Sequence, residues 1–170
     1  MALTKVRAGG YAAGGIIQTQ YTQLTTASTQ AWSSNTATAF TNVTVNITPT
    51  LASSIIKLEC HIAGEFSTED ATYDHVVFFY RDTTALKFTG STSGSKVGIS
   101  AITRTDRTTD ANSTGEIGYF TYFDSPNTTS QITYKLGIIS NIAATFYINT
   151  TANTSDEYFV SNIAATEIAG

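Results

Sequence analysis

The 170-residue chain has a net charge of −4, and only 13% of its residues are charged, about half the ~25% of an average globular protein. The acidic balance argues against general nucleic-acid binding, which needs a basic field to attract phosphates. No apolar run reaches the ~18–20 residues of a membrane-spanning helix, so we expect no membrane insertion. Cys60 is the only cysteine, which excludes an intrachain disulfide and suits assembly in a reducing cytoplasm.

Threonine takes the place of the missing charges, at about a fifth of the chain. It is β-branched, and its hydroxyl keeps the outer face of a sheet hydrated without a charge. Together with nine Tyr and nine Phe, this composition predicts an all-β protein.

The first 15 residues differ from the rest of the chain. They contain four glycines and no apolar block of the length found in a signal peptide, so they cannot form a core of their own. We expect residues 1–15 to be a flexible N-terminal docking arm and residues 16–170 to be one β-sandwich domain. The predicted docking contacts of the arm are Lys5, Arg7, Tyr11 and Ile16.

Strand signals then follow at short, regular spacing. The clearest is at Ile55–Ala63, where apolar residues from Ile56 to Ile62 alternate with polar ones from Lys57 to His61. The predicted strands are Ile16–Leu24, Thr36–Ile47, Ile55–Glu65, His75–Asp82, Ala85–Phe88, Val97–Thr103, Gly115–Phe123, Gln131–Ser140, Thr145–Thr150 and Glu157–Ile168.

The breaks between these runs are rich in turn formers, as in Thr48-Pro49-Thr50 and Asp124-Ser125-Pro126-Asn127. About eight to ten short strands with turns every 8–12 residues predict a two-sheet antiparallel sandwich, most simply jelly-roll-like. We therefore place no second domain after Ile16.

Residues that could carry chemistry are few. His61 lies on the polar side of its strand while Cys60 faces the other way, so the two cannot share a zinc ion, and a solvated histidine is the better interpretation. The acidic stretch 69–74 could offer oxygen ligands to calcium, but it lacks the spacing of a known calcium loop. No Gly-x-Ser-x-Gly nucleophile motif is present. We predict no catalytic, cofactor or metal site and leave calcium binding by the acidic stretch open.

Aromatic residues crowd two strands. The run Val76–Tyr80 is apolar on both faces, and such a strand needs a cover on each side. One cover is the sandwich core; the other is either a second subunit or the protein's own loops, and both readings stay open. The candidate subunit interface is Val77, Phe79, Tyr119 and Tyr122.

Several patterns resemble structural proteins of marine and cyanobacterial tailed phages. They are the Thr-rich stretch Asn42–Thr50 with its Ile-Thr-Pro, the Ser-rich turn and apolar strand at Ala52–Leu58, the hairpin Phe78–Leu86, and the ends Met1–Val6 and Ala165–Gly170. The resemblance covers roughly Thr36 to Gly170. It implies a jelly-roll-like sandwich, often trimeric, in a tail fibre or on the capsid surface, without catalytic residues.

On this resemblance we expect a virion protein assembled in the host cytoplasm. A short arm on one compact domain favours a homotrimeric capsid decoration protein, of the cement or head-fibre type, that binds other virion proteins through its arm. The alternative is a tail-fibre tip or adhesin that binds a host surface glycan. A polysaccharide-degrading enzyme is the least favoured class.

Overall fold

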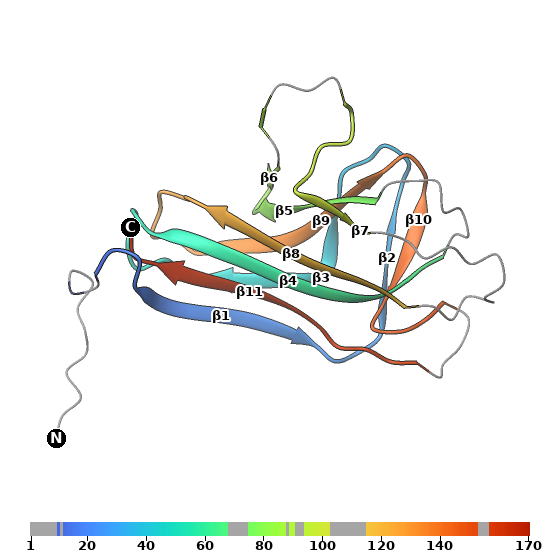
Figure 1. Cartoon of the computed structure of the whole chain (residues 1–170), viewed down its shortest axis with the longest axis horizontal. Coiled ribbons are helices and arrows are strands. Elements are labelled where there is room, and N and C mark those ends of the chain that lie inside the picture. Colours follow the sequence, from blue (N-terminus) through green and yellow to red (C-terminus); the bar gives the residue numbers. More distant parts are fainter. Residues whose placement is uncertain are drawn as a thin grey trace.

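A computed structural model of the protein describes residues 10, 12–67, 75–87, 89–90, 94–102, 115–152 and 157–170. All eleven regular elements in these ranges are β-strands (Figure 1). They are β1 (Ile16–Leu24), β2 (Ser28–Trp32), β3 (Thr38–Ile47), β4 (Ile55–Phe66), β5 (His75–Arg81), β6 (Thr84–Leu86), β7 (Ser100–Ile102), β8 (Glu116–Asp124), β9 (Ile132–Ser140), β10 (Ala144–Ile148) and β11 (Ser161–Ile168). Within the described ranges, no helix is long and apolar enough to cross a membrane.

The strands form two antiparallel sheets packed face to face. Sheet A has the order β1-β11-β4-β8; β10 pairs with the far end of the long strand β4, and β2 pairs with β10. Sheet B has the order β3-β9-β5, with β6 and β7 lying one after the other along the free side of β5. To compare this topology with known folds, we leave out β2 and β10, count β6 and β7 as one strand, and number the remaining eight strands from 1 to 8 along the chain. Sheet A then has the order 1-8-3-6 and sheet B the order 2-7-4-5. This is the strand order of a jelly roll, so the predicted fold class is confirmed.

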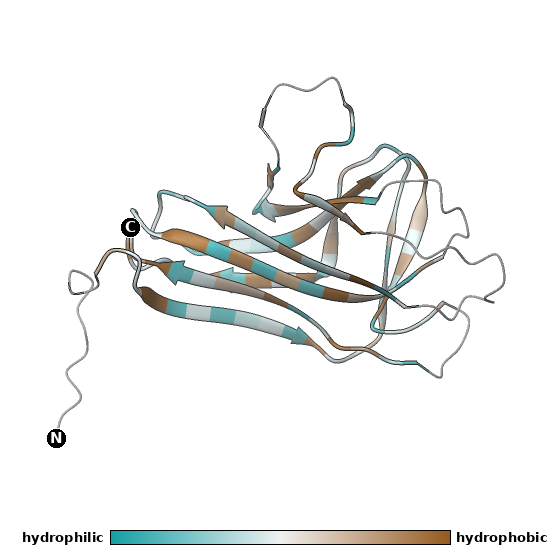
Figure 2. Ribbon diagram, in the orientation of Figure 1, coloured by the Kyte–Doolittle hydropathy of each residue, from teal (hydrophilic) through white to brown (hydrophobic). Residues whose placement is uncertain are grey.

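The core lies between the sheets and follows the period-two pattern, visible in Figure 2 as alternating colours along the strands. From β4, the residues Ile56, Leu58, Cys60 and Ile62 point inward and are fully buried. Burial raises the pKa of the Cys60 thiol, so the residue packs as a small hydrophobe, as predicted. The ten predicted strands all appear, with ends that differ by up to four residues, but β2 was not predicted.

Buried hydrogen bonds fix the end of the sandwich where β1 begins and β11 ends. The fully buried carboxylate of Glu167 accepts hydrogen bonds from the backbone N–H of Thr50 (2.6 Å) and Leu51 (3.1 Å). It also accepts from Ser54 Oγ and Gln18 Nε2, both at 2.7 Å. Burial alone raises the pKa of this carboxyl, but the four hydrogen bonds favour the ionised form more strongly, and the net pKa is lowered.

A second buried network joins the two sheets at the same end. Asp124 of β8 accepts hydrogen bonds from Arg81 Nη1 of β5 at 3.0 and 3.1 Å, and from the Tyr134 hydroxyl of β9 at 2.7 Å. The pKa of Tyr134 is raised, first by burial and then by its hydrogen bond to Asp124. The carboxylate is therefore satisfied by partners from the opposite sheet, which ties the two layers together.

Candidate interaction surface

The outward side of sheet A is the candidate functional site. The registers of β1, β11, β4 and β8 place outward residues in rows across the four strands. One row is Gln23, Asn162, His61 and Tyr119; the next is Tyr21, Ala164, Glu59 and Thr121; the third is Thr19, Thr166, Lys57 and Phe123. Ile16, Ile168 and Ile55 form a fourth row at the end where β1 begins, and Ile117 extends the β8 side beyond Tyr119. We call these residues the outer face of sheet A.

Large apolar side chains on this face are exposed. On β8, Ile117, Tyr119 and Phe123 are 68%, 62% and 58% exposed, and on β1, Tyr21 is 72% exposed. Ile16 and Ile55 are also exposed. Isolated exposed hydrophobic residues need no explanation, whereas a group gathered on one sheet face marks an interaction site.

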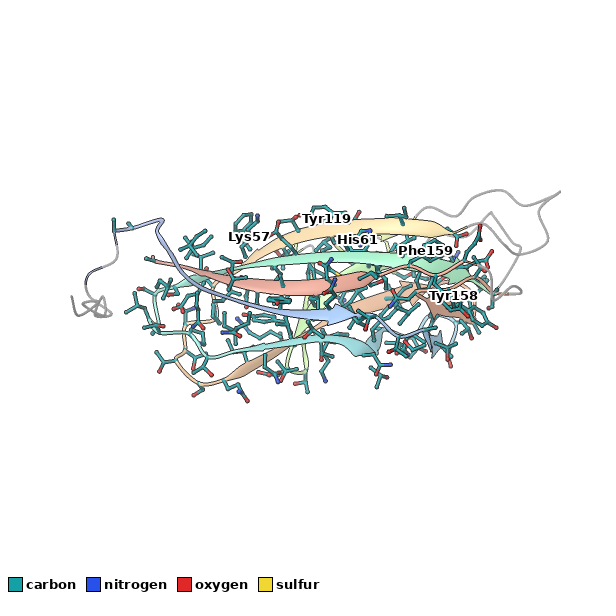
Figure 3. All side chains as sticks on the ribbon, turned by 90° about the horizontal axis from the view of Figure 1, so that it is seen from below. Lys57, His61, Tyr119, Tyr158 and Phe159 are labelled. Carbon is teal, nitrogen blue, oxygen red and sulfur yellow. The ribbon has the colours of Figure 1, made fainter. Side chains whose placement is uncertain are left out.

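The middle of the face carries a small polar network. Glu59 Oε1 lies 2.8 Å from Lys57 Nζ and accepts a hydrogen bond from the Tyr119 hydroxyl at 2.7 Å. The bonds from Lys57 and Tyr119 lower the pKa of Glu59, and the same bonds raise the pKa values of Lys57 and Tyr119. Figure 3 places Lys57, His61 and Tyr119 on this side of the sheet. The network holds the Tyr119 ring against β4 and neutralises the two charges locally.

Two residues of the predicted subunit interface are not on a surface. Val77 and Phe79 are both 0% exposed and belong to the core between the sheets, so their assignment to an interface is wrong. The other side of the same strand is covered as well, since Phe78 is 1% exposed in the single chain and its ring lies against Tyr80, at a centroid distance of 5.1 Å. The doubly apolar strand is therefore covered within one chain, and it does not call for a second subunit.

The two predicted interface residues on β8 have different surroundings. Tyr119 is on the outer face, whereas Tyr122 has the opposite parity and packs, partly buried, against the core. Tyr122 also lines a shallow groove of about 440 Å³ beside β8, together with Lys87, Thr89, Gly98, Ile99 and Thr121. The sequence did not lead us to Tyr21, Ile117 or Phe123. Residues 117, 119 and 123 are separated by even numbers and therefore share one side of a strand, and this spacing could have identified Ile117 and Phe123.

The predicted arm is only partly described. Lys5, Arg7 and Tyr11 lie outside the described residues. Ile16, the fourth predicted contact, is the first residue of β1 and is exposed on the outer face of sheet A. Backbone hydrogen bonds to the domain start before the predicted boundary, because Gly14 N donates to Ala169 O and Ala169 N donates to Gly15 O, both at 2.8 Å. Gly14 and Gly15 are thus held to the residue that follows β11, just before β1 begins at Ile16.

The other candidate groups do not gather into a reactive site. His61 is on the outer face beside Glu59, as predicted, and His75 is fully buried with its ring stacked on Phe66 at a centroid distance of 3.9 Å. The acidic stretch 69–74, kept open as a calcium loop, lies outside the described residues. In the described part of the chain, no three His, Cys, Asp or Glu side chains are grouped so that they could hold a metal ion.

Comparisons of the sequence with protein-family models and with curated proteins find no match. The class of the protein is therefore given by the fold: it is a jelly-roll β-sandwich with an exposed, partly aromatic face on one sheet.

Proposed function

We propose that this chain is a structural protein of a tailed-phage particle, a homotrimeric capsid decoration protein that attaches through its N-terminal arm. The role is non-catalytic and needs no cofactor. The observation that carries the proposal is the outer face of sheet A, where Tyr21, Ile117, Tyr119 and Phe123 stay exposed in the single chain, whereas the described strands of sheet B expose no large hydrophobic residue. Monomeric proteins rarely expose a group of large apolar side chains on one face, whereas a subunit of an assembly buries such a face against its partner.

The route of the N-terminal segment supports attachment. Gly14 and Gly15 pair with Ala169, so the chain enters the domain at the end of the sandwich where the C-terminus also lies (Figure 1). A segment that precedes Gly14 is therefore attached to the domain at this end, where a neighbouring surface could bind it. Lys5 and Arg7 would meet carboxylates of that surface, on a chain whose net charge is −4.

The test is attachment to particles. Deleting residues 1–12 keeps the pairing of Gly14 and Gly15, so we expect the truncated protein to fold and keep its oligomeric state. It should fail to co-sediment with virions that lack the protein, and Lys5→Ala combined with Arg7→Ala should weaken attachment less. The matched control is Lys135→Ala, which removes a charge from β9 on the opposite sheet. Full occupancy by the truncated form would refute arm-mediated attachment.

Position on the particle decides the class. Antibodies raised against the protein should label the heads of intact virions in electron micrographs. Label confined to the tail would favour the adhesin instead. The groove beside β8 supports that second candidate, because Tyr122 offers a ring to the apolar face of a sugar and Lys87 and Thr89 offer hydrogen-bond donors to its hydroxyls. Glycan binding that is lost in Tyr122→Ser and Lys87→Ala would support it.

A further inference from the structure

Exposed large hydrophobic residues are unequally divided between the two sheets. Among the described residues, six of them are on strands of sheet A and none is on a strand of sheet B; the six are Ile16, Tyr21, Ile55, Ile117, Tyr119 and Phe123. The remaining two, Tyr158 and Val160, lie in the segment before β11. If these exposed apolar residues had no role, we would expect them on both sheets rather than on one face of one sheet.

We propose that the outer face of sheet A is the surface through which copies of this chain contact one another. This inference deepens the proposed trimer and rests on it, and it replaces the predicted interface at Val77 and Phe79 with the side chains of β8 and β1. The occupant is a second copy of this chain: around a threefold axis, the β8 side of one outer face would meet the β1 side of the next, because a ring needs different parts of the surface to meet.

Charge favours a second copy as the occupant. The whole chain carries −4, so copies repel one another at most orientations. The only Lys, Arg, Asp or Glu side chains on the outer face are Lys57 and Glu59, and these cancel each other at 2.8 Å. These two charges sum to zero, so two copies can bring this face into contact without repulsion between like charges. The Glu59 carboxylate already accepts its hydrogen bond from Tyr119 before contact.

The face is also large enough. Four strands spaced about 4.8 Å apart give a width of about 19 Å, and the eight residues of β11 at about 3.3 Å each give a length of about 26 Å. The flat footprint is therefore about 500 Å² per subunit, and standing side chains add accessible area to it. This is of the same order as the ~800 Å² that each partner contributes to a standard interface.

A glycan fits this face less well than a copy does. The side chains of Ile117 and Phe123 have no polar atom to offer a sugar hydroxyl, and the Tyr119 hydroxyl already donates to Glu59. The groove that could cradle a small polar ligand lies beside β8, over Tyr122. Aromatic side chains are enriched in protein–protein interfaces, and Tyr21, Tyr119 and Phe123 supply them on this face.

The experiment measures oligomeric mass by light scattering after gel filtration, over a range of protein concentrations. Phe123→Glu and Thr121→Arg change exposed outer-face positions of β8, and circular dichroism checks that each variant folds. Each should raise the concentration at which the oligomer dissociates by at least about tenfold, because burying a charge opposite an apolar partner costs more than 1.4 kcal/mol. The controls are Asn46→Glu, at an exposed position of β3 in sheet B, and Tyr158→Ser, an exposed aromatic outside the outer face. Both should leave the oligomer unchanged.

The outcomes separate this inference from the proposed trimer. A trimeric wild type that Phe123→Glu and Thr121→Arg dissociate supports both. A trimeric wild type that these variants leave intact, while they remain folded, overturns the surface only. A dimeric wild type that they dissociate supports the surface and overturns the trimer. A wild type that stays monomeric at high micromolar concentration overturns both, and retention on a polysaccharide column that Phe123→Glu abolishes would then assign the face to a glycan.

Discussion

Glu167 is the residue on which the end of the sandwich depends most. Replacing it with Gln preserves the shape of the side chain and one acceptor oxygen, but it removes the charge and turns the second oxygen into a donor facing Gln18 Nε2. Hydrogen bonds to a charged acceptor contribute about 1.5–3 kcal/mol each, against about 0.5–1.5 for neutral pairs. The bonds from Thr50, Leu51 and Ser54 would each weaken by about 1 kcal/mol, and the bond from Gln18 would be lost.

The smaller cost of burying a neutral amide offsets part of this loss. We therefore expect Glu167→Gln to lower the free energy of unfolding by about 2–3 kcal/mol at pH 7. The effect should depend on pH, because the pKa of Glu167 is lower in the folded protein than in the unfolded chain. The stabilisation is fully present above the unfolded pKa of about 4.3 and is lost as the pH falls through the folded pKa. The difference between wild type and variant should stay constant from about pH 6 to 8 and shrink below about pH 4.

The assay is urea unfolding of both proteins at one fixed protein concentration, from pH 3 to pH 8. Glu157→Gln is the matched control, because Glu157 is exposed and its change should move the unfolding midpoint very little. Equal stability of Glu167→Gln and wild type at pH 7 would refute the assignment of Glu167 as the centre of this network. A stability difference that persists unchanged at pH 3 would show that shape rather than ionisation matters.

Three further predictions concern the interior. Tyr134→Phe removes the hydroxyl that donates to Asp124 at 2.7 Å and should lower the free energy of unfolding by about 1–2 kcal/mol in urea; an unchanged midpoint would contradict the network. Gly64→Ala would place a Cβ 2.0 Å from the carbonyl oxygen of Tyr147 and should cost about 3 kcal/mol or more, seen as a lower melting temperature. The buried Cys60 thiol should resist a thiol reagent in the native protein and react on unfolding, because its pKa is raised; rapid reaction in the native state would contradict its burial.

The sequence predicted the fold well because most strands have one apolar and one polar side. In β4, the apolar residues from Ile56 to Ile62 could only face the core, so both the strand and its orientation followed. The strand β2 escaped prediction because it is short and its sequence, Ser-Thr-Gln-Ala-Trp, is mostly polar. It is held by pairing with β10 and by the burial of Trp32, which are tertiary effects.

The candidate surface was harder to predict, because β5 and β8 carry large apolar side chains on both sides. Nothing local decides whether Val77 or Phe78 faces the core, and in the fold both are buried. Likewise, the role of Glu167 depends on backbone N–H groups at Thr50 and Leu51, more than a hundred residues away. Such partners become visible only when the C-terminal strand is placed beside the loop between β3 and β4.

The two ends of the strand β8 reverse the usual rule that apolar side chains face inward, and this reversal supports a partner for its outer side. Its inward side contains Glu116 and Asp124, both buried, while Ile117 and Phe123 point outward. The fold satisfies the inward carboxylates with hydrogen bonds from Phe66 N and from Arg81, so keeping them inside consumes polar partners that an apolar residue would not need. Phe120 and Tyr122 on the same inward side do pack against the core, so the reversal is confined to the two ends of the strand. Polar residues in place of Ile117 and Phe123 would give a single chain a more polar surface. A sequence that keeps charges inside and apolar side chains outside on the same strand is consistent with an outer face that is covered in the assembled protein.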